Sequence, residues 1–303
     1  MDFANFTMLV REELEKKVGD HCQVKLHDVR KNNGVVLKGI TMMQENNNIT
    51  PTIYLNNLYD DYKTGITSID NVIDDVISTY NRNKISHRVD MQYLLDYEHI
   101  KHKIVYKLVN TEKNSELLKD VPHKEFLDLS IIFKCLISDS ELGEASVLIH
   151  NVNMKMWNVT VEDLYQAAKE NTPRILKYEI KRMMDVLYEI MNGAPEFEHD
   201  ECMAECSDSV PMYVLSNRNK VDGAACLLYP DLIQDFADAI GGSYYIIPSS
   251  IHEVLLLPAE HEEDSAEIKS MIREINDTQV ITEEILSYSL YFYDRGERKI
   301  IKL

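Results

Sequence analysis

Two short stretches of this chain hold the residue types that chemistry requires. The first contains His199, Cys202 and Cys206, one imidazole and two thiols, which are ligands that zinc prefers. A structural zinc site takes four ligands, and no second cysteine pair follows at zinc-finger spacing. Acidic residues surround the segment, as is typical of an exposed loop. We therefore predict an exposed loop with incidental thiols and no metal or other cofactor, and these three residues remain the candidate metal ligands.

The second stretch, 249–253, reads Ser-Ser-Ile-His-Glu and combines the residue types of a hydrolytic triad. Ser250 and His252 would share one face of a strand at roughly 6–7 Å, beyond hydrogen-bond reach. The chain also has no Gly-x-Ser-x-Gly elbow. We therefore interpret Ser250 as a turn-capping hydroxyl and His252 as structural. A catalytic site would have to be assembled from distant residues, and His150 is the third candidate.

His150 also lies close to Asn151, Asn153 and Trp157 in the sequence, and these side chains could line a pocket. A tryptophan more often anchors packing, and we expect that role for Trp157. Neither a Gly-x4-Gly-Lys-Ser/Thr loop nor a Gly-x-Gly-x-x-Gly run is present, so the common nucleotide cradles are absent.

The clearest turn and helix-boundary residues of the chain lie in 210–258, which we predict to be a β-β-α-β-β unit. Apolar runs at 212–215 and 223–228 flank a polar turn. Pro230 stands where a first helical residue is favoured, an apolar stripe follows, and Gly241 ends the predicted helix. Two β-rich runs at 243–247 and 253–257 complete the unit.

Several segments resemble a domain-of-unknown-function family of Gram-positive anaerobes. They include the Asn217–Pro230 run with its Gly-Ala-Ala and Leu-Leu-Tyr-Pro, the Ile246–Pro258 run, Pro51–Gly65, Lys107–Leu129 and Leu148–Arg174. The resemblance covers nearly the whole chain. It implies membership of a bacterial family and brings no activity, cofactor or catalytic residue with it.

The rest of the chain predicts an α+β fold, with antiparallel hairpins and packed helices. A helix is expected over 3–18, a hairpin turn at Asn33-Gly34, and a helix whose apolar stripe runs from Ile69 to Tyr80. A helix beginning at Thr160 should stop before Pro173, and another should run over 180–191. We expect an N-terminal α+β region over 1–193, an acidic linker or loop over 194–209, and a C-terminal α+β domain over 210–303.

Charge and composition bound the function. The 303 residues carry 51 acidic and 32 basic side chains, a formal net charge of −19. Binding to nucleic-acid phosphates is therefore disfavoured. The chain has no apolar run that would span a bilayer and does not begin like a signal peptide. We expect a cytoplasmic protein whose five cysteines are free thiols.

These observations favour a cytoplasmic, non-enzymatic interaction or regulatory protein with a protein partner and no membrane or nucleic-acid ligand. Two alternatives stay open. One is a hydrolase-type enzyme with a site assembled from distant residues, and the other is an acidic nucleic-acid mimic or anti-defence protein. The sequence specifies neither the partner nor the oligomeric state.

Overall fold

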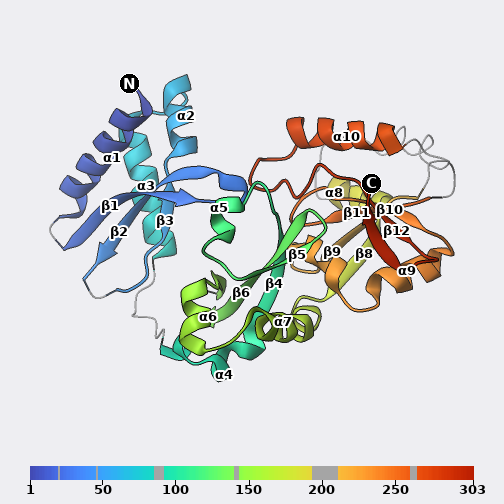
Figure 1. Cartoon of the computed structure of the whole chain (residues 1–303). Coiled ribbons are helices and arrows are strands. Elements are labelled where there is room, and N and C mark those ends of the chain that lie inside the picture. Colours follow the sequence, from blue (N-terminus) through green and yellow to red (C-terminus); the bar gives the residue numbers. More distant parts are fainter. Residues whose placement is uncertain (20, 46, 85–91, 140–142, 193–210, 260–264) are drawn as a thin grey trace. The chain divides into compact units, whose positions relative to one another are not determined.

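The computed structural model describes the chain except for residues 20, 46, 85–91, 140–142, 193–210 and 260–264 (Figure 1). The fold class is α+β, as predicted, with antiparallel sheets and packed helices. Its contacts define two compact units. The N-terminal unit comprises Met1–Leu94 and Ser138–Ala145, and the larger unit comprises Leu95–Ile137 and Ser146–Leu303.

These units do not follow the expected division into 1–193 and 210–303. Strands β8 (Tyr178–Arg182) and β9 (Tyr213–Asn217) pair in one sheet, so residues on both sides of the expected linker belong to the same unit. The linker itself, 194–209, lies outside the described residues.

The N-terminal unit is a three-stranded sheet of order β1-β2-β3 with helices packed on it. Its elements are α1 (Phe3–Val18), β1 (Cys22–Arg30), η1 (Asn32–Gly34), β2 (Val36–Gln44), β3 (Thr52–Tyr54), α2 (Asn56–Thr64) and α3 (Ile69–Asn83). The predicted bounds of α1 are confirmed. Asp2 caps its start by accepting a hydrogen bond from the Asn5 amide at 2.8 Å, and Gly19 ends it with a left-handed φ of 70°.

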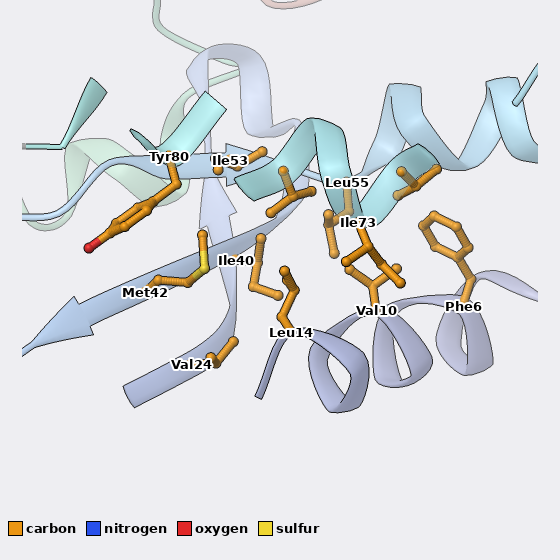
Figure 2. Packing of buried hydrophobic residues seen from close by; sticks show 12 residues of the cluster. Phe6, Val10, Leu14, Val24, Ile40, Met42, Ile53, Leu55, Ile73 and Tyr80 are labelled. Atoms are coloured by element: carbon orange, nitrogen blue, oxygen red, sulfur yellow. The ribbon is translucent and has the colours of Figure 1, made fainter. Parts of the chain in front are cut away.

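The core of this unit lies between α1, α3 and the sheet (Figure 2). Val72, Ile73, Val76 and Tyr80 from the predicted stripe of α3 are buried. They pack with Phe6, Val10 and Leu14 from α1 and with Ile40 and Met42 from β2. The helical periodicity of these apolar residues therefore identified the buried face correctly.

The larger unit contains two sheets. One has the order β13-β12-β10-β11-β9-β8, and the other has the order β4-β6-β5 with β7 also pairing with β6. The remaining strands are β4 (Ile104–Asn110), β5 (His123–Phe126), β6 (Leu129–Asp139), β7 (Gly143–Leu148), β10 (Tyr244–Ile247), β11 (Val254–Pro258), β12 (Tyr291–Asp294) and β13 (Lys299–Lys302).

Helices connect and cover these strands (Figure 1). They are η2 (Gln92–Leu95), α4 (Tyr97–Ile100), η3 (Lys101–Lys103), α5 (Ser115–Leu118), α6 (Asn151–Trp157), α7 (Val161–Ile175), α8 (Met183–Asn192), η4 (Gly223–Leu228), α9 (Leu232–Ile240) and α10 (Ser265–Thr278). Among the described helices, none has the length and apolar character to cross a membrane.

Three local predictions were wrong. Residues 223–228 form the 3-10 helix η4 and not a strand, because Asp222 adopts a left-handed φ of 54° and Ala224–Leu227 are buried without alternation. Residues 178–182 form β8 and not the start of a helix, since pairing with β9 supplies their hydrogen bonds. Helix α7 continues through Pro173 to Ile175. Proline there removes the amide that would donate to the Lys169 carbonyl, but only two residues of the helix follow it.

Candidate functional site

A clasped loop follows β9 in the larger unit. The Asn217 side chain donates from Nδ2 to the Val221 carbonyl at 2.7 Å, and its Oδ1 accepts from the Val221 amide at 3.3 Å. Lys220 and Asp222 both take left-handed φ values. The asparagine thus closes a tight loop on itself and directs the chain into Asp222 and η4.

Asp222 lies in a buried cluster of charges at the end of this loop. Its carboxylate pairs with Lys134 Nζ and lies 3.8 Å from Lys107 Nζ. The Asp222 and Lys134 side chains are each only 9% exposed. Both lysines point from the same face of the β4–β6 pair, since Val105 pairs with Lys134 and Lys107 with Ile132. The ion pairs therefore connect this sheet to the loop after β9.

The two lysines decide the protonation of Asp222. Burial by itself would raise the pKa of this carboxyl, but the charges of Lys107 and Lys134 outweigh it, helped by the hydrogen bond from Lys134 and the proximity of His252. The result is a pKa below the ordinary value of 3.8. Asp222 is therefore ionised at neutral pH and neutralises one of two partly buried ammonium groups.

His252 contacts this cluster from the turn before β11. Its Nδ1 accepts a hydrogen bond from the Asp222 amide at 3.2 Å, and its Nε2 lies 3.5 Å from Glu284 Oε1. An amide can only donate, so the neutral ring carries its proton on Nε2, toward the glutamate. Neither ring nitrogen is then available to take a proton from a serine.

The serines near His252 bond to its backbone. Ser250 Oγ accepts from the His252 amide at 3.0 Å, and Ser216 Oγ donates to the His252 carbonyl at 2.7 Å. The structure thus brings Ser250 and His252 together through the main chain of the turn and not as nucleophile and base. Such contacts shape a turn and do not activate a hydroxyl.

The remaining sequence candidates lie elsewhere. His150 is exposed at the start of α6, where its amide donates to Asn153 Oδ1 at 2.9 Å. No hydrogen bond of Ser250 or His252 within the described part of the chain reaches it. His199, Cys202 and Cys206 lie outside the described residues, and the residues that are described contain no group of three or more metal-ligating side chains.

A wide cleft in the larger unit surrounds Trp157. It has a volume of about 1160 Å³ and is lined from η2, α4, η3, α6, α7 and Pro230. Trp157 is half-buried, and its ring centroid lies 6.1 Å from that of Tyr97 with the planes tilted by 40°. Leu95 and Met156 add apolar surface and are 60% and 47% exposed.

Hydrogen bonds to main-chain groups fix the walls of this cleft. Asn158 ends α6 with a left-handed φ of 55°, and Thr160 then caps α7, with Asp163 accepting from the Thr160 amide at 2.8 Å. Asn171 is buried and donates to the Lys101 carbonyl at 2.7 Å, which attaches η3 to α7. The segments that carry Tyr97 and Trp157 are therefore fixed next to α7 by helix capping at Asn158 and Thr160 and by the buried Asn171 side chain.

The comparisons with known proteins give a family. A family model described as "Family of unknown function (DUF5688)" matches residues 3–295. The chain belongs to this family. No curated protein and no solved structure matches it. The predicted resemblance to a domain-of-unknown-function family is thus confirmed over nearly the full length.

Neither the charge cluster nor the place of Tyr97 in the aromatic pair was predicted from the sequence of this DUF5688 member. Lys107 and Lys134 each interrupt an apolar strand, Ile-Val-Tyr-Lys-Leu-Val and Ile-Ile-Phe-Lys-Cys-Leu-Ile. A lysine inside such a run needs a buried partner, and this was the available signal. The sequence carried no comparable signal for Tyr97, because it meets Trp157 only through the packing of α4 beside α6.

Proposed function

We propose that this chain is a cytoplasmic, non-enzymatic interaction or regulatory protein that binds a protein partner in the cleft around Tyr97 and Trp157. The observation that carries the proposal is the half-buried aromatic pair on the wall of an open cleft of about 1160 Å³. Aromatic side chains in partly exposed, concave surroundings are the residues that dominate binding energy in protein interfaces.

The polar groups of the chain agree with this proposal. The Ser250 hydroxyl, the His252 ring and the Ser216 hydroxyl are engaged with backbone groups or with a neighbouring side chain. Asp222 is paired with two lysines. These side chains stabilise the loop and the turn, whereas Leu95 and Met156 at the cleft are 60% and 47% exposed.

The proposal can be tested with a photoreactive benzoylphenylalanine in place of Met156, expressed in the organism that encodes the chain. Ile281 is the matched control position, since it is 59% exposed and does not line the cleft. We expect a discrete crosslinked partner from position 156 and none from position 281. The adduct should be lost in Trp157→Ala and retained in Trp157→Phe, provided that both variants remain folded.

Two results would contradict the proposal. Equal crosslinking from both positions, or adducts that do not depend on Trp157, would show that the cleft is not the interaction site. Stoichiometric labelling of Ser250 by a fluorophosphonate, abolished by His252→Ala in a folded protein, would instead support the hydrolase alternative.

A further inference from the structure

We propose that the N-terminal unit contains a binding pocket for a small, uncharged, largely apolar molecule that presents a hydrogen-bond acceptor such as a carbonyl oxygen. This inference goes beyond the proposed function, because every residue that lines the pocket belongs to the N-terminal unit. Two observations carry it. The pocket has an apolar floor, and the buried hydroxyl of Tyr80 on that floor has no partner in the described part of the chain.

The pocket lies where helix α1 and strand β2 end, where strand β1 begins, and beside the last turn of α3. It has a volume of about 460 Å³. Its floor consists of buried or half-buried side chains, which are Val18, Cys22, Met42, Ile77 and Tyr80. Its rim consists of exposed polar side chains, which are His21, Gln44, Glu45, Asn81 and Lys84. This volume and an apolar floor with few polar groups are typical of small-molecule sites.

The hydroxyl of Tyr80 gives the pocket a specific ligand chemistry. Tyr80 is only 6% exposed, and it lies on the buried face of α3. Figure 2 shows its ring pointing away from Phe6 and Val10, with the hydroxyl oxygen at the far end. No hydrogen bond joins this oxygen to any residue that the structure describes. A buried hydroxyl without a hydrogen bond costs free energy, and an acceptor bound in the pocket would remove that cost.

The surroundings of this hydroxyl favour an uncharged acceptor. Burial raises the pKa of Tyr80, and the nearby Cys22 raises it further, while burial also raises the pKa of the Cys22 thiol. Both groups are therefore protonated at neutral pH, and the phenol is the stronger donor of the two. A charged group at the floor would lose its hydration without a buried partner. The other ionisable residues of the lining, His21, Glu45 and Lys84, are exposed at the rim.

A ligand can reach this floor from the side of strands β1 and β2. A second hollow of about 750 Å³ borders the pocket there and shares some of its lining, namely His21, Cys22, Gln44 and Glu45. On the other side, Lys84 Nζ lies 5.9 Å from the centroid of the Tyr80 ring. An ammonium group can only donate hydrogen bonds, so this lysine cannot serve as the acceptor for the Tyr80 hydroxyl.

The test compares two molecules that differ chiefly in the acceptor. Acetophenone carries a carbonyl oxygen, and ethylbenzene has nearly the same size and shape without it. The full-length protein, labelled with ¹³C at its methionine methyl groups, is titrated with each molecule and followed by NMR. The reporter is the signal of Met42, which lines the pocket and is 1% exposed. Its signal is assigned from the spectrum of Met42→Leu.

Two matched variants isolate the hydroxyl. Tyr80→Phe removes only the oxygen, and Tyr62→Phe makes the same change in the same unit outside the pocket lining. Neither substitution removes a side-chain hydrogen bond to a described residue, so both variants should fold. We expect acetophenone at millimolar concentration to shift the Met42 signal saturably. Tyr80→Phe should weaken acetophenone about threefold to tenfold, the effect of one hydrogen bond, and should not weaken ethylbenzene. Tyr62→Phe should change neither affinity.

The inference is overturned if acetophenone does not shift the Met42 signal, which would show that the pocket does not bind this class of molecule. It is also overturned if Tyr80→Phe weakens both molecules equally or neither of them, or if Tyr62→Phe has the same effect as Tyr80→Phe. The hydroxyl would then play no part in recognition. None of these results bears on the proposed function, which the crosslink at position 156 in the larger unit tests separately.

Discussion

Gly223 is the position where one added methyl group should damage the larger unit most. It begins η4 directly after Asp222. A Cβ there would lie 2.8 Å from the Asn217 backbone nitrogen and closer still to Ser216 Oγ and the His252 carbonyl oxygen. Two of these three atoms belong to the main chain of β9 and of the turn before β11. They cannot rotate away as a side chain can.

The expected cost of Gly223→Ala follows from these contacts. Forcing extra volume into a packed site costs about 1–3 kcal/mol. Moving the Ser216 hydroxyl aside also breaks its 2.7 Å hydrogen bond to His252, at about 1 kcal/mol. Alanine also lowers the conformational entropy of the unfolded chain, which offsets roughly 0.4–1 kcal/mol of this cost. We expect the free energy of unfolding to fall by about 1–3.5 kcal/mol.

Urea titration followed by Trp157 emission measures this value, because Trp157 belongs to the larger unit. Gly242→Ala is the matched control in the same unit, since its added Cβ would meet no atom within 4 Å and its φ is not positive. That variant should retain or slightly exceed the original stability. A loss below about 1 kcal/mol for Gly223→Ala, or equal losses for both variants, would refute the close packing of Gly223 against β9 and the turn before β11.

Three further predictions concern charge, core and pH. Asp222→Asn keeps a side chain that tolerates the left-handed φ but leaves two lysines without their counter-charge, so it should lower the free energy of unfolding by about 3–5 kcal/mol in a urea titration. Adding Lys134→Met to this variant should recover a large part of the lost stability. Additive losses for the two substitutions would argue against the ion pair. Ile73→Ala in the buried face of α3 should cost about 2–4 kcal/mol by circular dichroism, whereas the exposed Asp75→Ala should cost under about 0.5 kcal/mol. Asp128 accepts hydrogen bonds from Tyr291 (2.7 Å), Ser287 (2.7 Å) and Ser289 (2.9 Å), which overcome the effect of burial and lower its pKa below 3.8. The ionised Asp128 carboxylate should therefore contribute its full stabilisation above pH ~4, and this contribution should be lost as the pH falls through the folded-state pKa. The thermal midpoints of the original chain and of Asp128→Asn should then converge in acid. A difference between the two midpoints that is independent of pH would contradict this.

Local patterns in the sequence determined the elements that depend on near neighbours. Helix α1 was predicted from Phe3 to Val18 because its cap, its apolar spacing and Gly19 all act within a few residues. The buried stripe of α3 followed from a period of 3.6 residues. The hydrogen bond between the Ser250 hydroxyl and the His252 amide is also of short range. The expected strand spacing of these two residues did not apply, because both lie in the turn before β11.

Tertiary structure decided what depends on residues far apart in the chain. Residues 178–182 became a strand because β9 lies beside them, and 223–228 became a 3-10 helix because Gly223 packs against β9 and the turn at His252. The pairing of Asp222 with Lys134 joins residues 88 positions apart. The meeting of Tyr97 with Trp157 likewise depends on how α4 packs beside α6. Hydrophobic period and turn propensity describe one segment at a time, whereas a charge cluster or a cleft exists only when separate segments pack together.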